Sequence, residues 1–353
     1  MTQYKVIDAF CGAGGLSIGL SKAGLNVVCG FDIDPLCIKT QQMNPQYIDH
    51  AVVEADVRSM LNGGLQEITG LEPEELDVLA GGPPCQGFSI QRTVGEDFDE
   101  RNLLVDDYGD LIKEVRPRLF LMENVTGLGG KRGSLLLKAF ERKVGLEGYV
   151  VHKRILDAQD YGVPQRRKRL LMVGERLDSG LAAYSWPVPD ESLPPTVYET
   201  IGHLPPPPDT GKDHPSFPGH RTDRLSSKNL ARLKALTEGQ SRVDLPKELL
   251  ADCHTVSADV VGHRNVYGRM EWDKVAPTIT ARFDSFTRGK FGHPVQMRTI
   301  SLYEGQLLQT FPRDYKFCGT KVEMARQIGN AVPPMFAHSL GRAIVDALTA
   351  KDM

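Results

Sequence analysis

A cysteine at a stiff turn is the feature of this sequence that most strongly indicates chemistry. The stretch Gly81-Gly82-Pro83-Pro84-Cys85 follows Leu76–Ala80, a short apolar run with the length of a buried strand. Proline fixes φ and donates no backbone N–H, so the two prolines present the next side chain on a rigid turn. A thiolate is a strong nucleophile near neutral pH, and rigid placement lowers the entropic cost of aiming it. We therefore predict that Cys85 is a nucleophile rather than a small buried cysteine.

A glycine-rich turn and two carboxylates suggest a nucleoside site. The segment Asp8-Ala9-Phe10-Cys11-Gly12-Ala13-Gly14-Gly15 follows a strand pattern and precedes a helix pattern, so a ligand can approach its backbone beside a helix N-terminus. Asp32 ends the second strand pattern, where it can accept the hydrogen bonds of a ribose diol. Asp56 follows an apolar run, where it can meet an adenine amino group. Taken alone, each carboxylate is also explained as a helix cap or a surface residue.

The elements that position these residues alternate between strand and helix patterns. Strand patterns occur at 4–10, 26–31, 76–80, 119–122, 149–156 and 169–173, and helix patterns at 16–23, 35–43, 103–115 and 134–144. This alternation predicts an α/β fold with a doubly wound, mostly parallel sheet, whose ligands lie at the carboxyl ends of the strands.

After about residue 175 the pattern changes. Residues 185–208 are proline-rich and read as a linker with a short helix at 197–201. Residues 209–297 are polar and irregular, with strand-like pieces such as Thr278-Ile279-Thr280. Helix patterns return at 301–310 and 335–348. We predict a large domain of residues 1–185 plus 322–353, and a smaller domain of residues 186–321.

Charge is distributed unevenly along the chain. The net formal charge is −3, but residues 1–110 carry 6 Lys and Arg against 18 Asp and Glu, while residues 212–298 carry 15 against 10. A basic region on an acidic body is typical of a protein that binds a polyanion, and ordinary surface scatter is the alternative.

Composition excludes several classes of protein. The N-terminus leads directly into a strand pattern, without a signal peptide, and no apolar run approaches the roughly 20 residues that cross a bilayer. The six cysteines form no CxxC pair and show no metal-ligand spacing. We expect a reduced cytoplasmic compartment, no membrane and no metal.

Taken together and in order, the motifs resemble those of the cytosine-C5 DNA methyltransferases of bacterial restriction-modification systems. The matching segments are Asp8-x-Phe10-x-Gly12-x-Gly14-Gly15, Pro83-Pro84-Cys85-Gln86, Arg101-Asn102-Leu103-Leu104, Glu123-Asn124-Val125, Gln165-x-Arg167-x-Arg169, 298–312 and 327–334. The resemblance covers nearly the whole chain outside about 177–270. Two departures are Ile33, where the family often has an aromatic residue, and Ile300-Ser301 in the ninth block.

The resemblance implies a Rossmann-like catalytic domain that uses S-adenosylmethionine, and a second domain that recognises the target sequence. It implies catalytic roles for Cys85, Glu123, Arg167 and Arg169. Cofactor contacts are implied for Asp8, Phe10, Gly12, Gly14, Gly15, Asp32, Ile33, Asp56, Val57, Pro83, Leu104, Asn330 and Ala331. DNA contacts are implied for Gln86, Ser89, Gln91, Arg92, Gln165, Thr280 and Arg282. The expected partner is double-stranded DNA, and the expected enzyme is a monomer in the prokaryotic cytoplasm.

The chemistry of the implied reaction accounts for these residue types. A thiolate that adds at C6 of cytosine makes C5 nucleophilic, and a carboxyl group at Glu123 relieves the charge at N3. Because Arg167 and Arg169 alternate, they share a face of an extended segment, so that one can hold the cytosine O2 and orient Glu123 while the other meets a phosphate. Solvated basic surface is the alternative for this pair. A duplex hides C5 and C6, so the base must be flipped out, and the polar segment 89–101 supplies Gln91 and Arg92 to fill the gap.

Three other functions fit parts of the pattern. A cytosine-C5 methyltransferase of structured RNA shares the catalytic residues, but the roughly 120 residues between Arg169 and Arg298 favour DNA. A non-catalytic DNA-binding protein on the same scaffold would not need Cys85, Glu123 and the two arginines together. A dehydrogenase is disfavoured because the glycine order is GxGG rather than GxGxxG.

Overall fold

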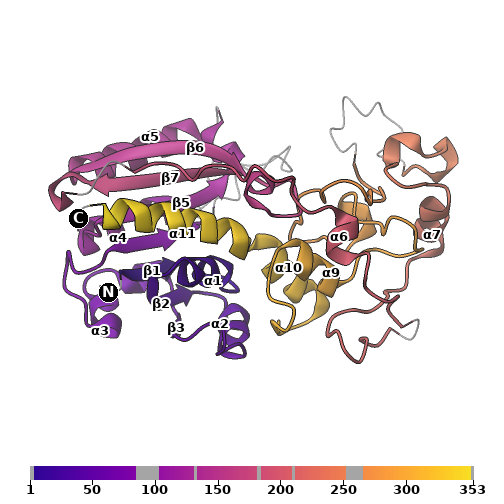
Figure 1. The fold of residues 1–353 in the computed structure, drawn as a ribbon, viewed down its shortest axis with the longest axis horizontal. Coiled ribbons are helices and arrows are strands. Elements are labelled where there is room, and N and C mark those ends of the chain that lie inside the picture. The colour runs from indigo at the N-terminus through magenta and orange to yellow at the C-terminus, as the bar shows by residue number, and fades with distance from the viewer. Residues whose placement is uncertain are drawn as a thin grey trace. The chain divides into compact units, whose positions relative to one another are not determined.

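The computed structural model describes residues 4–84, 103–130, 133–180, 184–208, 211–251 and 265–350. The chain divides into two compact units (Figure 1). The first contains Met1–Tyr161, Lys168–Asp190 and Val332–Met353, and the second contains Gly162–Arg167 and Glu191–Ala331. Residues 322–331 therefore belong to the second unit, which differs from the boundary expected from the sequence. The reason is that a helix at Lys321–Asn330 buries Ala325 and Ile328 in the second unit's own core.

A seven-stranded sheet forms the centre of the first unit, which confirms the α/β prediction. Its order is β3-β2-β1-β4-β5-β7-β6. The strands are β1 (Lys5–Ala9), β2 (Asn26–Asp32), β3 (Ala51–Glu54), β4 (Val78–Gly81), β5 (Leu119–Val125), β6 (Tyr149–Asp157) and β7 (Lys168–Arg176). The first five are parallel, while β7 runs antiparallel to both β5 and β6. The carboxyl ends of β1, β2, β4 and β5 consequently lie at one edge, where the predicted catalytic and cofactor residues follow them.

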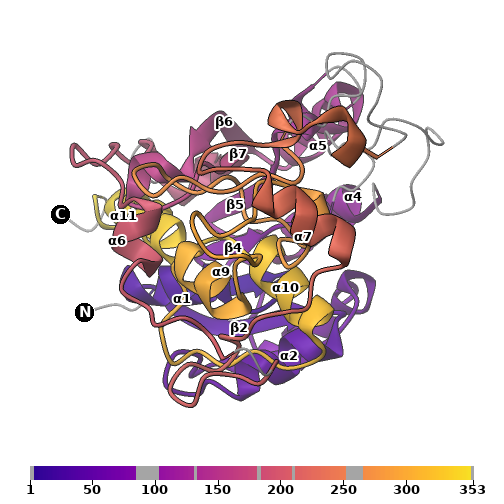
Figure 2. The same ribbon diagram turned by 90° about the vertical axis from the view of Figure 1, so that its right-hand side faces the viewer.

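Helices cover both faces of the sheet. They are α1 (Gly15–Lys22), α2 (Pro35–Gln42), α3 (Gly64–Thr69), α4 (Leu103–Val115), α5 (Ser134–Leu146) and α11 (Pro334–Thr349). Figure 2 shows α4 and α5 on the side of the sheet opposite to α1 and α11. Apolar residues at alternate strand positions, such as Leu79 and Phe120, form one core with α4 and α5. Their neighbours Val78 and Leu121 are equally buried, as expected of strands covered on both faces.

In its described residues the second unit is mostly irregular, with four short helices. These are α6 (Val197–Ile201), α7 (Ser227–Lys234), α9 (Leu302–Leu308) and α10 (Lys321–Asn330). Its main core joins α6, α9 and α10 to residues 270–291, while a separate small core lies around Leu233, Leu245 and Tyr267. The strand-like piece Thr278-Ile279-Thr280 is not a strand, because its polar groups bond to side chains and turns instead of to a ladder.

Within the described residues, no helix is both long enough and apolar enough to cross a membrane.

Candidate active site

The end of β5 brings a carboxylate to the turn that follows β4 and leads to the predicted nucleophile. Glu123 lies at the carboxyl end of β5, and its Oε2 is 3.4 Å from the position that a Cβ would take at Gly82. The next residue, Asn124, is buried, and its Nδ2 donates to the carbonyl of Pro83 at 2.9 Å. The turn before Cys85 is thus tied directly to the strand that carries Glu123. The predicted residues Cys85, Gln86, Ser89, Gln91 and Arg92 lie outside the described part of the chain.

An arginine from the neighbouring strand holds this carboxylate. Arg169 is paired with Val125 in the β5–β7 ladder, and its Nε is 2.7 Å from Oε1 of Glu123. The two side chains are only 14% and 12% exposed, so the pair is strengthened by a low local dielectric. Arg169 also donates through Nη1 to the carbonyl of Lys168 at 2.9 Å. The arginine therefore fixes the direction of the carboxylate through one of its oxygens, and leaves Oε2 on the side of Gly82.

A buried tyrosine joins the two strands at this edge. The hydroxyl of Tyr108, on α4, lies 3.0 Å from the carbonyl of Leu79 and 3.1 Å from that of Leu121. These carbonyls belong to β4 and β5, so the hydroxyl helps to hold the strand that precedes Cys85 against the strand of Glu123.

The glycine-rich turn after β1 has an unusual backbone. Phe10, Gly12 and Gly14 all have positive φ, at 57°, 52° and 81°. A positive φ is costly for a phenylalanine, so surrounding contacts must hold it in place. The turn is anchored to β2, because Cys11 N–H donates to the carbonyl of Phe31 at 3.0 Å.

Asp32 organises the same turn with both of its oxygens. Oδ2 accepts from the backbone N–H of Gly12 at 2.9 Å, and Oδ1 accepts from that of Asp34 at 2.9 Å. Burial raises the pKa of Asp32 even though these hydrogen bonds lower it. Each carboxylate oxygen keeps a second lone pair, so Asp32 can both shape the turn and accept from a ligand.

Asp8 is a second carboxylate in this region and is completely buried. Burial raises its pKa to about 7, although the Ser17 hydroxyl donates to its Oδ2 at 2.6 Å. Among the described residues its other oxygen accepts no hydrogen bond. The charge of Asp32 raises the pKa of Asp8 further. A positively charged ligand nearby would stabilise the ionised forms of Asp8 and Asp32 and so lower the pKa of both.

The remaining predicted cofactor residues of the first unit differ in how they are placed. Asp56 caps the short 3-10 helix Val57–Met60, since its Oδ1 accepts from the N–H of Arg58 at 2.9 Å. Val57 is 2% exposed and belongs to the core, and the cofactor contact expected of it stays a prediction. Ile33 is 65% exposed at the end of β2, and Leu104 packs partly against the core.

Two residues predicted to act on the substrate have structural roles in the second unit. Gln165 is fully buried: its Nε2 donates to the carbonyl of Leu308 at 3.0 Å, and its Oε1 accepts from the N–H of Ile279 at 2.9 Å. Its side chain is thus bonded within the second unit, and the DNA contact expected of it stays a prediction. The sequence alone does not distinguish such a buried glutamine from one that reads a base.

Arg167 is 1% exposed and does not share the surroundings of Arg169. Its guanidinium donates to the carbonyls of Ile279 at 3.0 Å, Gly329 at 3.1 Å and Ala331 at 2.9 Å. Arg167 and Arg169 therefore have different partners although they alternate in the sequence, and the roles predicted for them at the substrate stay predictions. Only Arg169 contacts Glu123 in the described structure.

The other predicted residues of the second unit are Asn330, Ala331, Thr280 and Arg282. Asn330 ends α10, and its carbonyl and that of Ala331 face Arg167. Thr280 is half-buried, and Arg282 is partly exposed with its Nε 3.1 Å from Asp284. Arg282 therefore keeps a side chain that can reach a phosphate.

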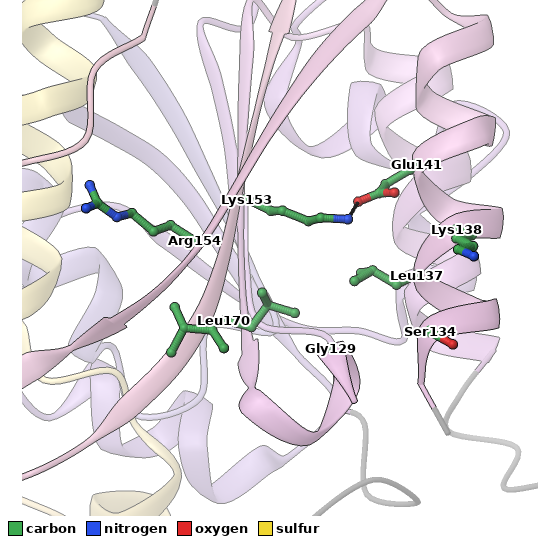
Figure 3. Close-up of a pocket in the computed structure, with 9 residues that line it drawn as sticks. Gly129, Ser134, Leu137, Lys138, Glu141, Lys153, Arg154 and Leu170 are labelled. Atoms are coloured by element: carbon green, nitrogen blue, oxygen red, sulfur yellow. Dashed lines mark hydrogen bonds and ion pairs between the residues drawn. The ribbon is translucent and has the colours of Figure 1, made fainter. Parts of the chain in front are cut away.

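A pocket between α5 and β6 lies apart from these groups (Figure 3). It has a volume of about 270 Å³ and is lined by Leu137 and Leu170, with Lys153 directed at Glu141 across 2.6 Å. Glu123 is not among the lining residues of this pocket. The carboxylate that does line it, Glu141, is already paired with Lys153. In the described ranges no group of three or more His, Cys, Asp or Glu side chains is arranged to hold a metal ion.

Comparison with known proteins agrees with the sequence motifs. Residues 4–346 match the family of C-5 cytosine-specific DNA methylases. The type II methylase M.HgiDII of Herpetosiphon aurantiacus is 36% identical over 97% of this chain and 94% of that protein. The type II methyltransferase M1.HphI of Haemophilus parahaemolyticus is 32% identical over 96% of this chain and 86% of that protein.

Solved structures show the same fold. A structure described as a DNA modification methyltransferase encoded within an E. coli prophage has a TM-score of 0.76 at 24% identity and covers 98% of this chain and 100% of that one. Spodoptera frugiperda DNMT2 has a TM-score of 0.63 at 16% identity over 97% and 100% of the two chains. The chain therefore belongs to the C-5 cytosine-specific DNA methylase family and is a DNA (cytosine-5-)-methyltransferase.

Proposed function

We propose that this enzyme methylates C5 of a flipped-out cytosine within a specific sequence of duplex DNA, through a covalent bond between Cys85 and C6. The observation that carries the proposal is the position of Glu123. Its carboxylate is held by Arg169 and lies beside Gly82, on the turn that leads to Cys85. A nucleophile and a carboxyl group at one strand edge are what addition to a cytosine ring requires.

The residues act in a defined order in this proposal. The Cys85 thiolate forms a bond to C6, the C5–C6 π electrons shift toward C5, and Glu123 hydrogen-bonds or protonates N3 to relieve the developing charge. Arg169 keeps the carboxyl group pointed at the ring during this step. After C5 has gained its methyl group, its proton leaves to a base, the C5–C6 double bond re-forms, and the thiolate is released.

The turn after β1 fits S-adenosylmethionine, which supplies an electrophilic methyl group when bound. Gly12 and Gly14 leave the backbone open to a ligand, and Asp32 can accept from a ribose diol. The raised pKa values of Asp8 and Asp32 reflect buried carboxylates that a sulfonium or ammonium charge would stabilise. Asp56, two residues after the end of β3, is proposed to accept from the adenine amino group.

The second unit is proposed to bind and recognise DNA, and the enzyme to act as a monomer in the prokaryotic cytoplasm. Support comes from the excess of 15 Lys and Arg over 10 Asp and Glu in residues 212–298. Because C5 and C6 are inaccessible in a duplex, the target base must leave the stack before Cys85 can reach it.

Methyl transfer from tritiated S-adenosylmethionine to duplex DNA tests this proposal. We expect label in 5-methyldeoxycytidine after nucleoside digestion, none with structured RNA, and none with Cys85→Ala. Label in RNA alone, or incorporation into another nucleoside, would overturn the proposed substrate.

A further inference from the structure

The strained turn after β1 is held from two directions. From β2, Asp32 accepts the N–H of Gly12. From α2, the side chain of Gln41 reaches the carbonyl of the same residue. Its Nε2 donates to the carbonyl of Gly12 at 2.7 Å and lies 3.0 Å from Sγ of Cys11. Asp32 and Gln41 thus form hydrogen bonds with both the N–H and the carbonyl of Gly12, whose φ is 52°.

Gln41 is an unusual residue to bury at this place. Its side chain is 0% exposed, yet among the described residues its Oε1 accepts no hydrogen bond. A buried amide oxygen without a donor is unfavourable, so another contact of the same amide must favour this placement. Turning the amide over would take the donor away from the carbonyl of Gly12 and bring Oε1 against that carbonyl oxygen at the same short distance.

Packing of the core does not require a glutamine at this position, so it does not explain the unsatisfied Oε1. Gly12 is half-buried, and its carbonyl accepts a hydrogen bond from Nε2 of Gln41. A methionine has nearly the shape of glutamine and would fill the same space without the unsatisfied Oε1, but it would take this donor away from the Gly12 carbonyl. The placement of a donor at this carbonyl therefore serves the conformation of the turn rather than the stability of the fold.

We propose that Gln41 is a positioning residue for the cofactor-binding turn, which it keeps in its left-handed conformation before the cofactor arrives. This inference rests on the proposed function, because the turn is assigned to S-adenosylmethionine there. Gln41 itself touches no cofactor in the proposal: it acts through Gly12 and Cys11. Pre-organisation of this kind lowers the ordering cost that binding would otherwise meet.

Gln41→Met tests the proposal, with Gln42→Met as the matched control on the exposed side of α2. We expect Gln41→Met to unfold at the same or a slightly higher denaturant concentration, while its Kd for S-adenosylmethionine rises about tenfold, equal to about 1.4 kcal/mol. KM for the cofactor should rise in parallel, with kcat at saturating cofactor and DNA affinity little changed. Gln41→Glu should lose more, since an ionised carboxylate cannot donate to Gly12.

A second measurement keeps the positioning role separate from the proposed cofactor. Amide hydrogen exchange of the peptide spanning residues 10–15, without any ligand, should be faster in Gln41→Met than in wild type and unchanged in Gln42→Met. Unchanged exchange would overturn the positioning role, as would a fall in stability with normal exchange. Faster exchange in a protein whose wild type does not bind S-adenosylmethionine would instead contradict the proposed function.

Discussion

At the scale of single residues, the structure separates side chains that the sequence presents as equivalent. Arg167 and Arg169 both belong to one basic run. Arg169 pairs with Glu123, whereas the guanidinium of Arg167 donates to backbone carbonyls. A buried guanidinium offers five donors in a fixed plane, so it can serve either a carboxylate or a set of carbonyls equally well. Which of the two it serves depends on the partner that the fold brings near.

Glu123→Gln is the residue change that separates charge from shape. Glutamine keeps the size of the side chain but cannot transfer a proton, and it leaves Arg169 without its anionic partner. We expect kcat to fall by a factor of roughly 10²–10⁴, the range typical of a lost general acid. Affinities for DNA and S-adenosylmethionine, measured by fluorescence anisotropy and calorimetry, should stay within about threefold of wild type. A variant that retains full kcat would remove Glu123 from the reaction.

At the scale of elements, the sequence predicts what is periodic and misses what depends on distant partners. The strands at 26–31 and 119–122 were predictable because long apolar runs bounded by glycine or polar residues indicate buried strands. The strand β3 is only four residues long, and β7 runs antiparallel, which no local pattern reports. The segment around Ile279 looks like a strand but is fixed instead by Gln165 and Arg167, more than 110 residues away in the chain.

The same limit applies to the site. Asp32 and Glu123 could be proposed as site residues because each lies at the carboxyl end of a strand, where ligands collect in this fold. Gln41 and Tyr108 could not, because each acts from within a helix by hydrogen bonds to backbone groups of another element. A buried polar residue on an otherwise apolar helix face is the one signal for them in the sequence.

A buried histidine, His293, in residues 292–297 of the second unit should make the stability of the fold depend on pH. Nδ1 of His293 accepts from the N–H groups of Val295 and Gln296, which requires a neutral ring, and burial lowers the pKa of His293 to about 4. The unfolded chain binds the proton near its ordinary value of 6.5, so stability is complete above pH 6.5 and falls as the pH drops toward 4. The loss should reach at most about 3 kcal/mol.

Denaturant unfolding at several pH values, compared with His293→Asn, isolates this contribution. His220 is also buried and its pKa is lowered. It contributes to the pH dependence of stability over the same pH range, but equally in both proteins. Asparagine can accept the same N–H groups but does not titrate, so the difference in unfolding free energy between the two proteins should change between pH 6.5 and 4. A difference that is constant over this range would show that His293 does not titrate on folding.

At the scale of the whole molecule, the second unit contains a main core, which serves as its scaffold, and a smaller separate core. The main core includes α9, α10 and the residues held by Arg167, whereas the small core around Leu233 and Tyr267 is built from a contiguous stretch together with Phe286. A separate small core can change its surface without disturbing the scaffold. We infer that sequence recognition resides mainly in this stretch.

Exchanging residues 211–268 for the corresponding stretch of the Herpetosiphon aurantiacus relative tests this division. We expect methylation to move to the relative's target sequence, with kcat within about tenfold of the parent, as read by bisulfite sequencing of a plasmid. DNA affinity should still fall steeply with salt, because phosphate contacts release counterions. A hybrid that remains soluble and folded but still methylates the original sequence would place recognition elsewhere.

The covalent adduct with 5-fluorocytosine DNA tests the central claim most directly. Fluorine at C5 cannot leave as a cation, so methyl transfer should trap the enzyme on a duplex whose cytosines are all 5-fluorocytosine. We predict a species of retarded mobility on a denaturing gel that forms only with S-adenosylmethionine and is absent in Cys85→Ser, because a serine hydroxyl is scarcely ionised at neutral pH. An adduct that persists in Cys85→Ser, or the absence of any adduct while 5-methylcytosine still forms on normal DNA, would contradict the mechanism.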